Sequence, residues 1–262
     1  MKHPISYLIS EQRGAVLWIY LNRPEVKNAF NLEMADGLLK AIRQGMKDPK
    51  VSAIVLSGRD GAFSAGGDIK RMSETRDLKR FFLQISKILH AAVLEMRRGP
   101  KPVLAAIPGY VGGVAFGLVL GADLRIASRE AKFNAATIRL GLVANGGATW
   151  FLPRLVGSGH AAEILLLGEI ISAEEAHRIG LVNRVVFHDN LESEAQRIAE
   201  KLASGPKKAL ARLKQILNES PNASLSAQLA KERQAIAWSA TTEDFKEGIA
   251  AFLEKRSPNF KT

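Results

Sequence analysis

A short apolar segment, a glycine turn and a helical segment follow one another twice in the first half of this chain. Residues 51–57 are apolar and rich in β-branched side chains, a glycine pair lies at 66–67, and apolar residues recur at helical spacing over roughly 77–97. Residues 103–107 begin a second such unit, which continues through a glycine turn into a helix near 113–121. Buried strands that alternate with helices are typical of α/β domains with right-handed crossovers, so we predict an α/β fold.

The two ends of the chain have different patterns. Residues 5–9 and 15–21 read as the strands of a hairpin with a glycine turn between them. After about residue 189 the sequence is rich in Ala, Leu, Lys and Glu at helical spacing. We therefore predict an α/β core over residues 1–190 and an α-helical C-terminal region over residues 191–262.

The composition excludes several kinds of functional site. The chain contains no cysteine, so disulfides, thiolate metal sites and a cysteine nucleophile are excluded. Its five histidines show no metal-ligand spacing, and we predict no bound metal. The first residues lack the apolar stretch of a signal peptide, and the uncharged run 102–122 holds two prolines and five glycines, which favours a buried strand, turn and helix over a membrane span. We therefore predict a cytoplasmic protein that does not enter a membrane.

The formal net charge of +11 permits an anionic partner. Nucleic acid, a membrane surface and a polyphosphorylated small molecule all carry the required charge. The basic residues are scattered along the sequence, and no aromatic-rich RNA platform or recognition motif accompanies them. An RNA-binding function therefore rests on the charge alone, and we do not expect a nucleic-acid partner.

The two glycine turns are the segments that can carry chemistry. They read FSAGGDI over residues 63–69 and PGYVGGVAFG over residues 108–117. Glycine lets backbone N–H groups approach a ligand closely, and a helix start adds the positive end of its dipole. Two such turns that face one point would form an oxyanion hole, a pair of donors that stabilises negative charge on a substrate oxygen. Neither turn matches the GxxxxGK[ST] pattern or a strict GxGxxG pattern, and each alone is more typical of a structural turn.

Together with further segments, these turns resemble the crotonase (enoyl-CoA hydratase/isomerase) superfamily along nearly the whole chain. The matching segments are residues 22–24, 27–29, 63–69, 100–109, 112–113, 122–127, 151–157, 180–186 and 247–260. Residues 141–150 read GLVANGGATW and resemble the isomerase-like branch. The resemblance implies the crotonase fold, a spiral of ββα units with a helical C-terminal trimerisation region, and assembly as a homotrimer or a dimer of trimers.

The resemblance also implies a ligand and the residues that bind it. The ligand is an acyl-CoA thioester, so coenzyme A is part of the substrate and no separate cofactor is expected. Gly67 and Val114 would supply the two oxyanion N–H groups, and Val114 stands where the family has the middle glycine of a triplet. A backbone donor survives this change of side chain. The expected CoA-binding residues are Lys27, Ala29, Ala65, Asp68 and Ile69, with Phe252 and Lys255 contributed by a neighbouring subunit.

The reaction also needs an acid or base, and here the sequence departs from the hydratase pattern. Enolisation places negative charge on the thioester oxygen, and a positioned side chain must move the proton. Hydratases of this family use two glutamates, whereas Gly117 and Thr137 stand at those positions. Isomerase-like relatives carry Pro-Asp where this chain has Ala144-Asn145. Asn145 can hold a substrate or water by hydrogen bonds, but it cannot shuttle a proton.

His90 is the remaining titratable candidate. It lies on the predicted helix 77–97, where the related 4-chlorobenzoyl-CoA dehalogenase has its histidine base, and unperturbed histidine titrates near neutrality, as a base should. A helix histidine that only packs is the alternative. The expected apolar pocket walls come partly from residues Met72, Leu78, Phe81, Phe82 and Ile85.

These residues and the family resemblance are compatible with three functions. The first is an enoyl-CoA isomerase of fatty acid metabolism that shifts a double bond, with His90 and Asn145 as candidate catalytic residues. The second is an enoyl-CoA hydratase (a lyase) or a thioester hydrolase that uses His90 and water. The third is a non-catalytic acyl-CoA-binding paralogue that has kept the oxyanion hole and lost its acid and base.

Overall fold

The structure is a computed structural model that describes residues 7–260. Two β-sheets form the centre of the molecule. The larger sheet has the strand order β1-β2-β3-β5-β7-β10 and the smaller has the order β4-β6-β8-β9. All neighbouring strands are parallel except β1 with β2 and β8 with β9. The strands are β1 (Leu8–Arg13), β2 (Val16–Leu21), β3 (Ala53–Gly58), β4 (Ala62–Ser64), β5 (Val103–Ile107), β6 (Tyr110–Gly112), β7 (Leu124–Ser128), β8 (Lys132–Asn134), β9 (Ile170–Ser172) and β10 (Arg184–Val186). Residues 5 and 6 of the predicted hairpin lie outside the described residues.

Helices follow most of these strands, as the repeated strand, turn and helix pattern predicted. The helices are α1 (Leu32–Lys47), α2 (Ile69–Glu74), α3 (Leu78–Arg98), α4 (Val114–Leu120), α5 (Ala148–Leu167), α6 (Ala173–Arg178), α7 (Leu191–Ala203), α8 (Lys207–Glu219), α9 (Leu225–Ser239) and α10 (Glu243–Leu253). The predicted helices over 77–97 and 113–121 correspond to α3 and α4. The short helix α2, which directly follows the first glycine turn, was not predicted.

The six-stranded sheet is buried on both faces. In β2, Trp18 and Tyr20 belong to the cluster that includes α7, whereas Ile19 and Leu21 belong to the cluster that includes α1 and α3. All four side chains are buried. A strand with two buried faces is apolar throughout, which is why residues 15–21 form an unbroken apolar run.

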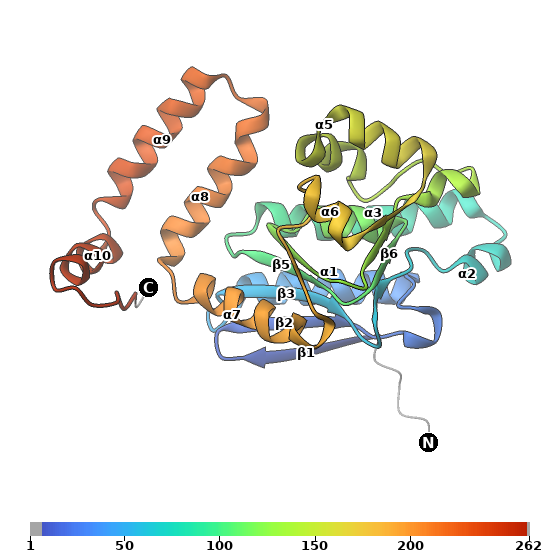
Figure 1. The fold of residues 1–262 in the computed structure, drawn as a ribbon, viewed down its shortest axis with the longest axis horizontal. Coiled ribbons are helices and arrows are strands. Elements are labelled where there is room, and N and C mark those ends of the chain that lie inside the picture. The colour runs from blue at the N-terminus through green and yellow to red at the C-terminus, as the bar shows by residue number, and fades with distance from the viewer. Residues whose placement is uncertain (1–6, 261–262) are drawn as a thin grey trace.

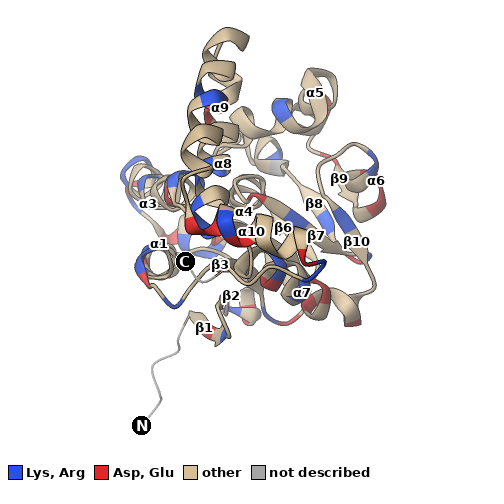
Figure 2. Cartoon of the chain, turned by 90° about the vertical axis from the view of Figure 1, so that its left-hand side faces the viewer, with Lys and Arg blue, Asp and Glu red and all other residues tan. Residues whose placement is uncertain are grey.

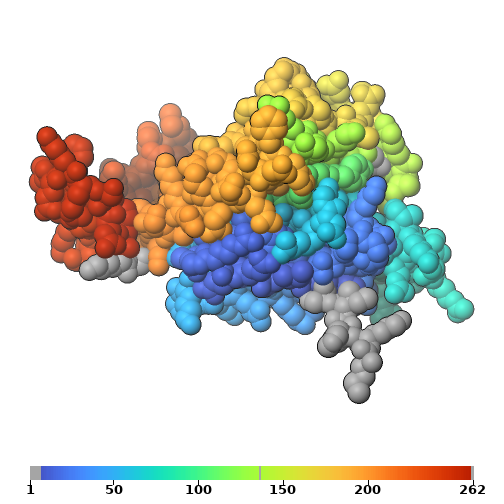
Figure 3. Space-filling model, turned by 60° about the horizontal axis from the view of Figure 1, so that its bottom comes forward, coloured from blue at the N-terminus to red at the C-terminus, as the bar shows by residue number. Residues whose placement is uncertain are grey.

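Helix α7 belongs to this core by its packing. Leu191, Ala195 and Ala199 recur every four residues and are buried against the sheet in one stripe. The predicted division at residue 190 therefore falls between the sheet and a helix that covers it. The segment that stands away from the core consists of α8, α9 and α10, which form one end of the molecule (Figures 1 and 3).

This C-terminal arm is joined to the core by a buried cation. Lys214 Nζ on α8 pairs with Asp123 Oδ2 at 2.7 Å and donates to the carbonyl oxygens of Met96 and Lys101 at 2.6 and 2.7 Å. The rest of the arm leaves large apolar side chains in contact with solvent, and exposed apolar surface of this kind marks a site of association. These exposed residues include Leu217, Leu225, Leu229, Ile236, Phe245, Ile249, Phe252 and Leu253.

Neither a membrane helix nor a cluster of metal ligands is found among residues 7–260. No helix there is both long and apolar enough to cross a bilayer. Likewise, no three His, Asp or Glu side chains of the described residues gather where a metal ion could bind. Figure 2 shows Lys and Arg interspersed with Asp and Glu on the face that it presents. The cytoplasmic location and the lack of a nucleic-acid partner stay predictions.

Candidate functional site

The two glycine turns of the sequence lie against each other. Strands β4 and β6 are parallel neighbours, and their ends bring Gly66 next to Gly112 and Gly113. A Cβ atom on Gly66 would lie 2.7 Å from the carbonyl oxygen of Gly112 and 3.2 Å from the Cα atom of Gly113. Gly66 also has a φ of +99°, so both its conformation and its surroundings require glycine.

Gly66→Ala is expected to lower the free energy of unfolding by about 3 kcal/mol, because the new methyl group meets backbone atoms in a left-handed conformation. Gly14→Ala is the matched control, since Gly14 has a φ of +60° but an added Cβ atom would meet nothing within 4 Å. The free energy of unfolding of the control should fall by only about 1–2 kcal/mol, which is the cost of the left-handed conformation alone. Urea denaturation followed by circular dichroism measures both, and equal losses would contradict the close contact of the two turns.

The N–H group of Gly67 points away from the segment with which Gly67 pairs. Gly67 forms a parallel bridge with Phe30, in which Phe30 N donates to Gly66 O at 2.7 Å and Asp68 N donates to Phe30 O at 3.0 Å. Successive residues of an extended chain direct their N–H groups to opposite sides. Since Asp68 N faces Phe30, the Gly67 N–H faces away from Phe30.

The N–H group of Val114 lies directly after the second glycine turn. Gly113 N donates to Asn134 O at 3.1 Å, and Gly113 itself lies next to Gly66 of the first turn. Val114 is the first residue of α4, and a helix offers no acceptor to the N–H groups of its first turn. Within residues 7–260, neither the Gly67 N–H nor the Val114 N–H donates to a protein acceptor. The two predicted oxyanion donors therefore lie on facing turns and are free.

A cavity of about 670 Å³ is lined by both Gly67 and Val114, and we call it the front cavity. Its other walls come from α2, α3 and the loop before α5, and most of them are apolar. The apolar residues include Ile69, Met72, Phe82, Ile85, Leu89, Leu142 and Val143. Of the predicted pocket walls, Met72, Phe82 and Ile85 are confirmed. Phe81 packs against the core instead, and Leu78 is exposed.

The polar groups of the front cavity are neutral apart from one guanidinium. Ser86, Tyr110, Thr137 and Asn145 line it, together with the exposed Arg139. Among its described lining residues there is no carboxylate, imidazole or amine. The cavity is therefore suited to hold and polarise a ligand, and it lacks a conventional proton acceptor.

Gly117 leaves no space for a catalytic side chain. A Cβ atom at this position would lie 2.4 Å from Asn145 O and 2.6 Å from the carbonyl carbon of Gly146. Helix α4 thus packs backbone to backbone against the loop before α5. A glutamate at residue 117 would require this loop to move.

Asn145 is held by hydrogen bonds at both ends of its amide. Its Oδ1 accepts from Gly146 N at 2.7 Å and lies 2.5 Å from His90 Nε2, and its Nδ2 donates to Ser86 Oγ at 2.8 Å. A backbone N–H can only donate, so Gly146 fixes Oδ1 on this side. Oδ1 is an acceptor, so His90 must carry a proton on Nε2. Ser86 was missed from the sequence, although it lies four residues before His90 and so shares its helix face.

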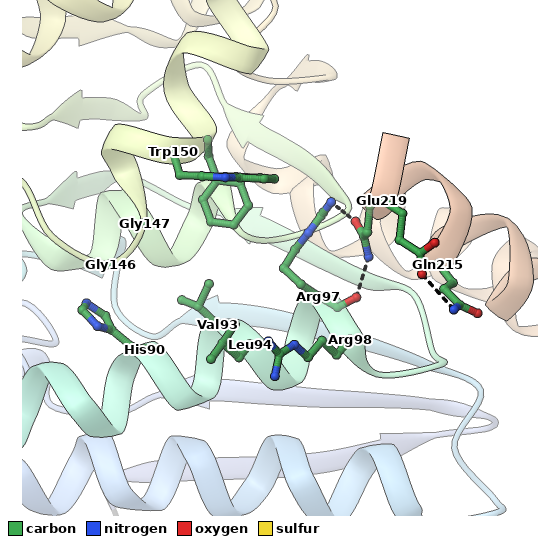
Figure 4. A pocket seen from close by; sticks show the side chains of 12 residues that line it. His90, Val93, Leu94, Arg97, Arg98, Gly146, Gly147, Trp150, Gln215 and Glu219 are labelled. Atoms are coloured by element: carbon green, nitrogen blue, oxygen red, sulfur yellow. Dashed lines mark hydrogen bonds between the residues drawn. The ribbon is translucent and has the colours of Figure 1, made fainter. Parts of the chain in front are cut away.

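His90 does not line the front cavity. It lines a second cavity of about 720 Å³, which we call the rear cavity, together with Gly146, Gly147 and Trp150 (Figure 4). Its Nε2 presents a proton to Asn145 rather than a lone pair. The two predicted catalytic residues are therefore in contact, but only Asn145 reaches the space in front of the two N–H groups.

Four of the predicted CoA-binding residues surround the first glycine turn in different ways. Ala65 and Ile69 line the front cavity. Lys27 is exposed, and its carbonyl oxygen accepts from Ala65 N at 2.8 Å. Ala29 is buried next to this segment. A ligand that left the cavity along this edge would pass Ala65 and Lys27.

Asp68, the fifth of these residues, is engaged within the protein. Its carboxylate pairs with Arg23 Nη2 at 2.9 Å and accepts from Arg71 N at 3.2 Å as the N-cap of α2. Burial alone would raise the pKa of Asp68, but the Arg71 N–H and the Arg23 guanidinium hold it below its ordinary value. The side chain therefore fixes the turn that carries Gly67.

Phe252 and Lys255 lie far from the front cavity of their own chain. They belong to α10 and the residues after it, at the opposite end of the molecule from α2 (Figure 1). The Phe252 side chain is 83% exposed. A role for these two residues in ligand binding requires another copy of the chain.

Proteins of solved structure share this fold over nearly their full length. A solved enoyl-CoA hydratase from Polaromonas sp. JS666 superposes with a TM-score of 0.93 at 34% identity, covering 97% of this chain and 99% of that one. The molecule therefore has the crotonase fold with its C-terminal helical region, as predicted. A family model described as enoyl-CoA hydratase/isomerase matches residues 11–262, and the chain belongs to that family.

Two relatives from Escherichia coli (strain K12) show the range of the family. The 1,2-epoxyphenylacetyl-CoA isomerase is 35% identical, and the match covers 98% of each chain. The 2,3-dehydroadipyl-CoA hydratase is 36% identical over 98% of this chain and 99% of its own. Isomerases and hydratases are thus similar to this chain to the same degree, and the choice between them depends on its own residues.

Proposed function

We propose that this protein binds an acyl-CoA thioester in the front cavity, polarises the thioester carbonyl between the N–H groups of Gly67 and Val114, and shifts a double bond of the acyl group through the enolate. The observation that carries the proposal is the pair of N–H groups without a protein acceptor at one apolar cavity. Donors held in a cavity with little water stabilise the charge that develops on the oxygen far more than donors in solution. No separate cofactor enters this proposal.

The acid/base positions support isomerisation over hydration. Addition of water requires one group to activate the water and another to deliver a proton. Gly117 has no space for a side chain, and Thr137 offers a hydroxyl where a hydratase would need a carboxylate. Isomerisation needs only one group that removes a proton from one carbon and returns it to another.

The proton acceptor is the weak component of the proposed site. A neutral amide does not accept a proton at physiological pH, so the proton removed from one carbon would pass to a water molecule that Asn145 orients and return from it to the other carbon. His90 lies behind it and directs an N–H to it. We therefore expect slow turnover, limited by proton transfer.

The same observation supports a second candidate, a non-catalytic acyl-CoA-binding protein. The described lining of the front cavity has no carboxylate or imidazole, which is what the loss of an acid and base would leave. A hydratase or thioester hydrolase that uses His90 is the remaining alternative. It would require His90 to act through Asn145 or to enter the front cavity.

A panel of 2-enoyl-, 3-enoyl- and aryl-acyl-CoAs separates these functions, with products followed by mass spectrometry and binding by calorimetry. Interconversion of 2-enoyl and 3-enoyl thioesters would support the isomerase. Tight binding without any product would support the binding protein, and 3-hydroxyacyl-CoA or free CoA would support the hydratase or hydrolase. If no acyl-CoA binds, the proposal fails.

We also propose that the chain assembles as a homotrimer or a dimer of trimers. The exposed apolar side chains of the arm need a cover, and Phe252 and Lys255 are too far from the front cavity of their own chain to contact its ligand. Light scattering after size exclusion should give three or six times the chain mass of 28.5 kDa. A monomer that bound CoA as tightly with Lys255→Ala as without it would contradict both the assembly and the role of Lys255.

A further inference from the structure

The rear cavity lies directly behind the front cavity, and the proposed function does not use it. Helix α3 runs along both, because Ser86 and Leu89 line the front cavity whereas His90 and Leu94 line the rear one. The loop before α5 also serves both, since Asn145 lines the front cavity and the next residue, Gly146, lines the rear one. The two spaces of about 670 and 720 Å³ are therefore separated by little more than one layer of side chains.

Asn145 and His90 meet across this boundary, and we call this pair the wall. His90 Nε2 lies 2.5 Å from Asn145 Oδ1. The amide of Asn145 is further fixed by Ser86 Oγ at 2.8 Å and by Gly146 N at 2.7 Å. Because both ends of the amide are bonded, rotation of the Asn145 side chain would break several hydrogen bonds at once.

The rear cavity is apolar next to the wall and polar at its far end. Val93, Leu94 and Trp150 follow His90 along its length, and Arg97 and Glu219 lie at the opposite end (Figure 4). A compartment with apolar sides suits a hydrocarbon chain that enters from the wall. The polar end lies where such a chain would terminate.

We propose that the wall sets the maximum length of the acyl group, and that the rear cavity receives the end of a longer acyl chain once the wall is removed. This inference rests on the proposed function, because the thioester must be held at Gly67 and Val114 for its tail to meet the wall. His90 is then a residue that determines specificity by holding Asn145 in place.

The wall predicts a break in the dependence of affinity on chain length. Each methylene group that moves from water into an apolar cavity tightens binding about fourfold. For the wild-type protein, the dissociation constants of saturated acyl-CoAs should fall with each added carbon until the tail reaches the wall, and then stop falling. Without the wall the fall should continue, with a gain on the order of a hundredfold after three or four further carbons.

Calorimetry with saturated acyl-CoAs from butanoyl to hexadecanoyl tests this with three variants, His90→Ala, Asn145→Ala and the double variant. The break should move to longer chains, most of all in the double variant. Leu94→Ala is the matched control, because it enlarges the rear cavity without opening the wall and should leave the break in place. Adding Leu94→Trp to the double variant should refill the rear cavity and abolish the gain.

The possible failures are distinguishable. If acyl-CoAs bind with the same break in every variant, the wall is wrong and the proposed function stands. If the break moves but Leu94→Trp does not reverse it, the longer chains do not enter the rear cavity and the inference fails. If neither short nor long acyl-CoAs bind to any form, both proposals fail. Because His90 is exposed and alanine favours helices, circular dichroism should show an intact fold for His90→Ala.

Discussion

Val114→Pro is expected to lower the turnover of an enoyl-CoA by about 10²–10³-fold while the protein stays folded. Proline removes the backbone N–H, which no other side-chain substitution can do. Val114 is the first residue of α4, a position that proline favours because its N–H is not used by the helix. The preceding Gly113 has φ 51° and ψ −127°, outside the α region that a following proline disfavours.

Val114→Ala is the matched control for this variant. It removes most of the side chain and keeps the N–H, so its turnover should stay close to that of the wild-type protein. The loss in Val114→Pro should appear mainly in kcat, because the donor acts on charge that develops during the reaction. Equal kinetics for the two variants would mean that the Val114 N–H does not contact the reacting oxygen.

Asn145→Asp is expected to raise the isomerisation rate by about 10²–10⁴-fold, the usual contribution of a positioned general base. The new carboxylate would face the front cavity, which Asn145 already lines. Gly146 N and His90 Nε2 are already directed at Oδ1, and the Ser86 hydroxyl can turn to donate to the second oxygen. These donors would keep the carboxylate ionised and ready to accept a proton.

Asn145→Ala separates a new base from the simple loss of the amide. It should show no gain, and measurement with a short enoyl-CoA keeps the length of the cavity from affecting the comparison. A rate increase in both variants would mean that the amide obstructs the substrate. No increase in either would show that proton transfer does not limit the wild-type protein.

Local patterns in the sequence predicted the α/β class, whereas the crotonase fold was predicted from the family resemblance. Apolar runs such as 51–57 and 103–107 become buried parallel strands, and the glycine turns follow them where expected. The boundary of the core was harder to place, since α7 and the arm share a composition. The signal for α7 was present in the four-residue spacing of Leu191, Ala195 and Ala199, which gives a narrow stripe suited to a sheet.

The sequence and its family resemblance supplied the candidate site residues, whose roles stay predictions, but they did not supply the geometry of the site. The two turns that carry Gly67 and Val114 meet because β4 pairs with β6, whose partners Ala62 and Tyr110 lie 48 positions apart in the sequence, and no local pattern specifies this pairing. His90 was placed on the correct helix, but the sequence did not show which of the two cavities it lines. Side chains one helical turn apart on α3 line different cavities. Ser86 lies one turn earlier and lines the front cavity, whereas His90 lines the rear one.

The carbonyl stretching frequency of a bound thioester tests the two N–H donors most directly. Butanoyl-CoA labelled with carbon-13 at the carbonyl gives a band that difference infrared spectroscopy can isolate, and this ligand has no double bond to react. Binding to the wild-type protein and to Val114→Ala should move the band to lower frequency than in water, and Val114→Pro should reverse much of that shift. A bound thioester whose band stays at its solution frequency in the wild-type protein would contradict polarisation by Gly67 and Val114.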